Sequence, residues 1–137
     1  PSRLVGSEMC IRDRKRAENF EYFLDLLPDW CFKGFNLKGQ SNYAFNVILN
    51  EPNQQLMNKL EKKLEENGIE YRRGSAGGGN QMRQPYVRKI YNFTEKDFKE
   101  ISPVTDHVHF YGMYLGNYPE LTFKSIDEIA AIISSVE

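Results

Sequence analysis

The chain is poor in cysteine and has no long apolar run. Its 137 residues include two cysteines, Cys10 and Cys31, whose spacing does not fit a metal site. A disulfide framework is therefore not expected, and a reducing compartment, the cytoplasm, is predicted. No apolar run reaches the length that a bilayer requires, and no leader resembles a signal peptide. A membrane span is not expected.

The chain also lacks an excess of charge of either sign. Its 18 basic and 19 acidic side chains give a net charge of −1, and no block of like charge occurs. Nucleic-acid binding normally requires a basic patch, so this class of partner is excluded. The length predicts one domain with a single modest core.

The first fourteen residues have an unusual sequence. The stretch LVGSEMCIRDR, Leu4 to Arg14, resembles a translated sequencing adaptor, and a segment of that origin has no evolved role in the fold. The alternative is an ordinary polar strand at the N-terminus. With the adaptor interpretation, residues 1–14 are a non-native extension without a packed role, and residues 15–137 are the tail of a longer protein. The remaining 123 residues carry 15 basic and 17 acidic groups, a net charge of −2.

Beyond residue 14 the hydrophobic pattern alternates between helix and strand. Apolar spacing of three and four residues predicts helices, and alternation of β-branched and aromatic residues predicts strands. The predicted helices cover residues 15–27, 52–67, 85–92, 102–110 and 122–136, and the predicted strands cover residues 43–49, 69–73 and 110–117. The pattern indicates an α/β fold, in which a small mixed or antiparallel sheet has helices on one side. Residues 43–49 are expected to form the central strand, and the aromatic segment 29–41 to pack on a partner surface.

The stretch YRRGSAGGGNQMRQPY, Tyr71 to Tyr86, combines glycines with polar side chains. Three successive glycines let main-chain N–H groups approach an anion, although neither the P-loop nor the dinucleotide-binding spacing is met. Arginine suits phosphate or carboxylate, whereas neutral amides suit sugar hydroxyls. The candidate donors are Arg72, Arg73, Arg83, Asn80, Gln81 and Gln84. The alternative is a mobile surface loop with solvated arginines.

His107 and His109 lie two residues apart and would face the same way on a strand. Because no third ligand lies nearby in the sequence, a structural or solvent-facing pair is favoured over a metal site. The stretch LGNYPEL, Leu115 to Leu121, is typical of a turn. No serine, histidine and acid arrangement indicates a nucleophile, so no catalytic residue is assigned.

Four short motifs occur in an order that one enzyme family shares. They are Asn67-Gly68-Ile69, Gln84-Pro85-Tyr86, Tyr118-Pro119 and Leu121-Thr122. Together with the order of helices and strands, they resemble the C-terminal domain of the DegT-type sugar aminotransferases and dehydratases over essentially all of residues 15–137. The resemblance implies the small domain of a fold-type I enzyme that uses pyridoxal or pyridoxamine 5′-phosphate.

A longer motif resembles one branch of this family. Gly79-Asn80 followed by Arg83-Gln84-Pro85-Tyr86 is most similar to the enzymes that remove the 3-hydroxyl of nucleotide-linked 4-keto-6-deoxy sugars in lipopolysaccharide and O-antigen synthesis. The chain departs from that branch in SAGGGNQMRQPY and in LGNYPEL, so a sugar aminotransferase is the alternative. The resemblance implies a nucleotide-linked 4-keto-6-deoxy sugar as substrate and a homodimeric full-length enzyme.

The resemblance also implies which residues bind substrate and which are absent. The cofactor-bearing lysine, or the histidine that replaces it in dehydratases, belongs to the large domain of such enzymes, so this chain alone is expected to be inactive. The iron–sulfur cluster of one dehydratase branch is left open. The stretch from Tyr71 to Tyr86 would form one wall of the active-site cleft. The implied substrate-binding residues are Arg73, Gly79, Asn80, Gln81, Arg83, Asn117 and Tyr118.

Electrostatics favours this role for Arg73 and Arg83. A guanidinium beside three glycines is costly to bury without an anion, so an anionic ligand is expected as its partner. Replacing Arg83 is then expected to weaken ligand binding and to leave folding unchanged. A second hypothesis, from another class of protein, is a free-standing α+β module whose glycine loop binds a small anion.

Overall fold

The structure is a computed structural model, which describes the backbone of residues 2–137 and the side chains of residues 9–137. The α-helices are α1 (Ser2–Leu26), α2 (Gln54–Glu66), α3 (Pro85–Tyr91), α4 (Glu95–Ile101), α5 (Pro103–Tyr111) and α6 (Phe123–Ser134). The strands are β1 (Ala44–Ile48), β2 (Arg72–Arg73) and β3 (Gly112–Gly116), and two short 3-10 helices, η1 (Ala76–Gly78) and η2 (Gln81–Arg83), lie between β2 and α3. The predicted helices and strands are confirmed, whereas α4 was not predicted, because Phe98 is its one buried residue.

The three strands form one antiparallel sheet in the order β1-β3-β2, as the α/β prediction allowed. Phe45 pairs with Leu115 and Val47 with Met113, so these four buried side chains share one face. The prediction that residues 43–49 form the central strand is wrong, because β3 lies between β1 and β2. Alternation along a strand defines its buried face but carries no information about its neighbours in the sheet.

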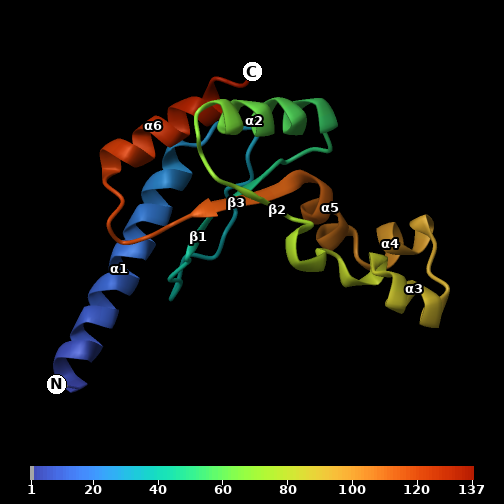
Figure 1. The fold of residues 1–137 in the computed structure, drawn as a ribbon, viewed down its shortest axis with the longest axis horizontal. Coiled ribbons are helices and arrows are strands. Elements are labelled where there is room, and N and C mark those ends of the chain that lie inside the picture. The colour runs from blue at the N-terminus through green and yellow to red at the C-terminus, as the bar shows by residue number, and fades with distance from the viewer. Residues whose placement is uncertain (1) are drawn as a thin grey trace.

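Three helices cover the apolar face of this sheet, with α2 and α6 side by side above β3 (Figure 1). The core between the helices and the sheet contains Phe20, Phe23, Leu24, Leu27, Phe45, Val47, Met57, Leu60, Leu64, Met113, Leu115, Ile126 and Ile133. The rings of Phe23 and Phe45 stack with centroids 4.4 Å apart. Each such side chain contributes about 1.5–3 kcal/mol by leaving water, so apolar burial is what joins the layers.

Local signals set the ends of α2 and α6. The Asn53 side chain accepts the N–H of Leu56 at 3.0 Å, which caps the first turn of α2. Gly68 follows this helix with φ +68°, a left-handed conformation that costs glycine no Cβ clash. At α6, Thr122 Oγ1 accepts the N–H of Ser125 at 3.2 Å. These ends lie where the sequence predicted them.

Helices α3 and α4 form a helical arm, residues 85–101, that projects beyond one end of the sheet (Figure 1). The arm packs on η2 and α5. A capping box starts α4, because Asp97 accepts hydrogen bonds from the backbone N–H and hydroxyl of Thr94 at 2.6 and 2.8 Å. The arm exposes the large apolar side chains of Tyr86, Ile90, Tyr91 and Ile101. A small number of contacts near η2 and α5 therefore holds it in place.

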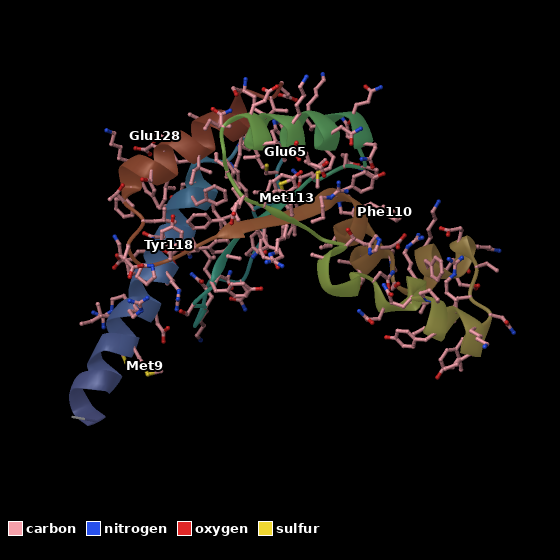
Figure 2. The ribbon with its side chains drawn as sticks, viewed as in Figure 1. Met9, Glu65, Phe110, Met113, Tyr118 and Glu128 are labelled. Atoms are coloured by element: carbon pink, nitrogen blue, oxygen red, sulfur yellow. The ribbon has the colours of Figure 1, made fainter. Side chains whose placement is uncertain are left out.

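Helix α1 continues without a break through the adaptor-like residues, so the alternative of an N-terminal strand is wrong. Met9 and Ile11 are exposed, and Figure 2 shows Met9 on the free end of α1. Arg12 forms an exposed ion pair with Glu120 at 3.1 Å. The side chains of residues 1–8 lie outside the described part of the chain. The non-native origin of residues 1–14 stays a prediction.

The aromatic segment 29–41 packs mainly on the core of this chain. Cys31 is buried, and its backbone forms an isolated antiparallel β-bridge with Leu49. Burial raises the pKa of its thiol to about 12. Phe35 contacts Phe20 edge-on with centroids 5.5 Å apart. The expectation of a partner surface stays a prediction for the exposed Phe32, while Cys31 and Phe35 contact the core of this chain. No helix described between residues 2 and 137 is long and apolar enough to cross a membrane.

Candidate functional site

The glycine loop, residues 74–84, leaves the end of β2 and folds against α5. Gly74 N–H donates to the Gly112 carbonyl oxygen at 2.7 Å, and a Cβ at Gly74 would collide with the Val108 carbonyl. At Gly79 φ is +56°, and a Cβ there would collide with the His109 ring. Glycine is required at both positions by the close approach of the loop to α5, whether or not an anion binds.

Arg83 lies at the centre of a buried cluster between the loop and the arm. Its Nε and Nη2 donate to the two oxygens of Asp106 at 2.5 and 3.0 Å, which forms a two-point ion pair. The guanidinium also lies between the rings of Phe98 and Phe110, 4.5 and 4.6 Å from their centroids. Glu95 adds an exposed carboxylate 3.0 Å from Nη2. Hydrogen bonding to Arg83 lowers the pKa of the Asp106 carboxyl, so this pair stays ionised at neutral pH.

Asn80 is buried beside the same carboxylate, with 2% of its surface exposed. Its Nδ2 donates to Ser102 Oγ at 3.1 Å and to Asp106 Oδ1 at 3.2 Å. Its Oδ1 accepts the N–H of Met82 at 3.1 Å, and its own N–H donates to His109 Nδ1 at 2.9 Å. The side-chain oxygen and nitrogen of Asn80 thus both have partners within the chain.

Both histidines lie on α5 and contact different elements. His109 accepts the Asn80 N–H through Nδ1, which places its own proton on Nε2, and burial followed by the charge of Arg83 lowers its pKa. His107 Nε2 lies 2.6 Å from the Leu49 carbonyl oxygen. The expectation that the two face the same way on a strand is wrong, because residues two apart on a helix point about 200° apart. No cluster of metal-binding side chains occurs within the described residues.

Arg72 and Arg73 are adjacent on β2 and therefore point to opposite faces of the sheet. Arg73 Nη1 forms an ion pair with Glu61 of α2, and Nη2 donates to the Phe110 carbonyl oxygen at 2.7 Å. Arg72 is exposed and pairs across the sheet with Tyr114. The two arginines thus differ: Arg73 joins β2 to α2 and α5, and Arg72 faces solvent.

Arg73 and Arg83 do not require an anionic ligand, so that expectation is wrong. Glu61 and Asp106 already supply the negative charge that burial of these guanidinium groups requires. Sequence reasoning missed both acids. Asp106 lies four residues before Phe110 on a predicted helix, which indicates a shared face, but nothing in the sequence links it to Arg83, 23 positions away.

A groove of about 850 Å³ lies along the edge of β2, next to Tyr114 and Gly116. Tyr71 in its wall donates to Glu65 at 2.7 Å, and burial, followed by this hydrogen bond, raises the pKa of Tyr71 to about 12. Arg72 and the exposed Glu70 also line the groove. Its charges are therefore mixed, which does not favour an anion over a neutral polar ligand.

Asn117 and Tyr118 lie at the far end of β3 from the glycine loop. Figure 2 shows Phe110 and Tyr118 beyond opposite ends of this strand, whose five residues span about 17 Å. The Asn117 amide donates to the carbonyl oxygens of Arg16 and Asn42 at 2.9 and 2.8 Å, whereas the Tyr118 side chain is exposed. The structure gathers Arg73, Gly79, Asn80, Gln81 and Arg83 near one end of the sheet. It places Asn117 and Tyr118 apart from them.

The helices and the three-stranded antiparallel sheet match part of three larger solved structures. Among solved structures, the chain is similar to a GDP-4-keto-6-deoxymannose-3-dehydratase with a trapped PLP–glutamate geminal diamine, with a TM-score of 0.74, 21% identity, and coverage of 93% of this chain and 32% of that one. It is similar to the E. coli GDP-4-keto-6-deoxy-D-mannose-3-dehydratase with bound hydrated PLP at a TM-score of 0.74 and 22% identity, with the same coverage.

A third similar structure is PseC of Helicobacter pylori, an aminotransferase of pseudoaminic acid biosynthesis. Here the TM-score is 0.70 and the identity 12%, over 91% of this chain and 32% of that one. No protein-family model and no curated protein matches the sequence. The chain spans about a third of the length of the three solved structures. At these identities the similarity establishes the fold.

Proposed function

We propose that this chain is part of a pyridoxal- or pyridoxamine-phosphate-dependent enzyme that modifies a nucleotide-linked sugar. Residues 15–137 are its C-terminal small domain, and residues 1–14 are a non-native extension. The reaction is removal of the 3-hydroxyl of a nucleotide-linked 4-keto-6-deoxyhexose. The full-length enzyme is a cytoplasmic homodimer that serves lipopolysaccharide and O-antigen sugar synthesis.

The extent of the structural similarity is the observation that carries this proposal. Of the chain, 93% superposes on two 3-dehydratase structures with a TM-score of 0.74 at 21% and 22% identity, against 12% for the aminotransferase. The motif Gly79-Asn80 followed by Arg83-Gln84-Pro85-Tyr86 independently favours the same branch. The two observations agree on the chemistry of the substrate.

The residues of this chain do not fit the cofactor. Pyridoxal phosphate is held through a Schiff base to a lysine, and the resemblance implies a histidine at that position in the proposed branch. The glycine loop contains no lysine, His107 contacts the Leu49 carbonyl, and His109 accepts the Asn80 N–H. We therefore assign cofactor binding to the part of the enzyme outside this chain. When bound there, the cofactor supplies the electron sink of the reaction.

We propose that the glycine loop forms one wall of the substrate site, with its residues in two roles. The exposed groups, the Gln81 side chain and the backbone of residues 75–77, contact the nucleotide sugar. Tyr118, also exposed, contributes from the other end of β3. The remaining candidates act by shaping the site through their internal contacts; they are Arg73, Gly79, Asn80, Arg83 and Asn117.

The test is an assay of the full-length enzyme. The recovered gene product is incubated with its cofactor and a nucleotide-linked 4-keto-6-deoxy sugar, with and without L-glutamate as amino donor, and the sugar is analysed by mass spectrometry. Loss of the 3-hydroxyl supports the proposal. Gain of an amino group identifies the aminotransferase instead, and an unchanged sugar contradicts both. The 137-residue chain alone is expected to bind no cofactor and to show no pyridoxal absorbance.

The free-standing anion-binding module is the second candidate, and the exposed glycine-containing backbone of residues 75–77 is the observation that favours it. The gene sequence upstream of Lys15 separates the two. A large α/β domain in frame supports the enzyme, and a start codon close to Lys15 supports the module.

A further inference from the structure

The Arg83 guanidinium joins the glycine loop to helices α4 and α5. Arg83 ends η2, contacts Glu95 and Phe98 on α4, and contacts Asp106 and Phe110 on α5. Arg83 is largely buried at this junction, with 13% of its side chain exposed. Removing it would release the loop and the arm together.

The charge of this cluster is balanced without a ligand. Asp106 neutralises Arg83 and also accepts from Asn80, so its two oxygens serve two residues of the same loop. A ligand anion that bound Arg83 directly would have to displace a carboxylate that is itself 8% exposed. That exchange leaves one buried anion unpaired, which is strongly unfavourable.

The loop has a buried base and an exposed tip. Asn80 and Arg83 form the base, while residues 75–77 and Gln81 are exposed. Gln84 closes the tip on itself, because its Nε2 donates to the Gly78 carbonyl oxygen at 2.7 Å. The shape of the tip therefore depends on the base below it.

We propose that Asp106 is the positioning residue of the glycine loop: by holding Asn80 and Arg83 it fixes the tip in one shape before any ligand arrives. That this fixed shape helps the tip to bind a nucleotide sugar rests on the proposed function. A loop ordered in advance binds more tightly, because its conformational freedom is already lost in the free protein. Arg83 then acts through the shape of the loop and does not contact the ligand.

The loop itself is tested in the 137-residue chain by amide hydrogen exchange. Asp106→Asn is expected to accelerate exchange at the Asn80 and Arg83 amides by about tenfold or more, the equivalent of one charge-assisted hydrogen bond, with core amides such as Leu60 unchanged. The control Glu100→Gln removes a carboxylate that pairs with Lys96 on the exposed side of the arm, and should change nothing. Unchanged loop amides overturn the proposal, and so does equal acceleration of loop and core.

Arg83→Lys provides a second variant in case Asp106→Asn does not fold. It keeps the charge but loses the planar two-point contact, so exchange at the Asn80 amide should rise above that of the wild-type chain. Wild-type protection of the loop in Arg83→Lys would show that the geometry of the pair is immaterial, which also overturns the proposal.

The ligand contribution is tested in the full-length enzyme with a nucleotide-linked 4-keto-6-deoxy sugar. Asp106→Asn should raise KM by about tenfold and keep kcat within about twofold, and Asp106→Glu should restore part of the loss, as expected for lost preorganisation. A fall in kcat at constant KM, or no change in either, overturns the positioning role. If the wild-type enzyme leaves this sugar unchanged, the proposed function is wrong, while the exchange experiment still decides whether Asp106 orders the loop.

Discussion

Replacing Arg83 by alanine removes the cation from a pair whose partner is 8% exposed. The Asn80 amide would remain as a donor to Asp106, but the carboxylate would lose its counter-charge. The lost charge-assisted hydrogen bonds are worth about 1.5–3 kcal/mol, and the contacts with Phe98 and Phe110 about 0.5–1 kcal/mol each. The arm can open locally and let water reach Asp106, so the cost is smaller than for breaking a fully buried ion pair. We expect a loss of about 2–4 kcal/mol in the free energy of unfolding. This replaces the expectation that folding is unchanged.

The assay is urea unfolding of the 137-residue chain, followed by two probes. Trp30 packs against the main core, so its fluorescence reports the body, whereas far-UV circular dichroism reports all helices, including the arm. With a denaturant slope of about 1–3 kcal/mol per molar urea, the midpoint should fall by about 1–2 M. If the arm opens first, the dichroism signal will decrease at lower urea concentration than the fluorescence.

Arg88→Ala is the matched control, because Arg88 is 44% exposed, lies 3.8 Å from the same Glu95 and faces the same Phe98 ring. An exposed pair of this kind contributes about 0–1 kcal/mol. The reasoning is refuted if Arg83→Ala costs no more than Arg88→Ala by both probes, since the burial of the Arg83 and Asp106 pair would then have no energetic consequence.

Three further outcomes are expected. Gly79→Ala should destabilise the chain in urea by more than Gly77→Ala, because both have positive φ but only a Cβ at Gly79 meets the His109 ring; equal losses would contradict the close approach. The folded pKa of His109 lies below its unfolded value of 6.5, so its contribution to stability is present above pH 6.5 and is lost as the pH falls from there towards the folded pKa. Across this pH window the free energy of unfolding should decrease less in His109→Gln than in the wild-type chain. Deleting residues 1–14 should lower Tm by less than about 4 °C, because the Arg12 and Glu120 pair is exposed, and a larger fall would show a packed role.

The sequence predicted the fold where the signal is local. Apolar spacing identified five of the six helices described, and the predicted ranges 52–67 and 122–136 match α2 and α6 to within two residues at each end. It did not reveal α4, which has one buried residue, or the central position of β3, because strand order depends on contacts between distant segments. The expectation that His107 and His109 share a strand conflicted with the helix predicted over residues 102–110, and the structure places both on α5.

The candidate site likewise has features that the local sequence predicts and features that depend on contacts between distant segments. The amino-acid sequence alone showed that glycines, arginines and amides gather between Tyr71 and Tyr86, and that the chain resembles one family of sugar-modifying enzymes. Which of these groups are exposed to a ligand depends on the packing of distant segments. Glu61 and Asp106 neutralise Arg73 and Arg83 across gaps of 12 and 23 residues, whereas Arg72 faces solvent from the next position on the same strand. An ionised side chain is neutralised by the opposite charges that the fold brings within a few ångströms of it. This proximity is set by packing between segments far apart in the sequence, and no local pattern connects such segments.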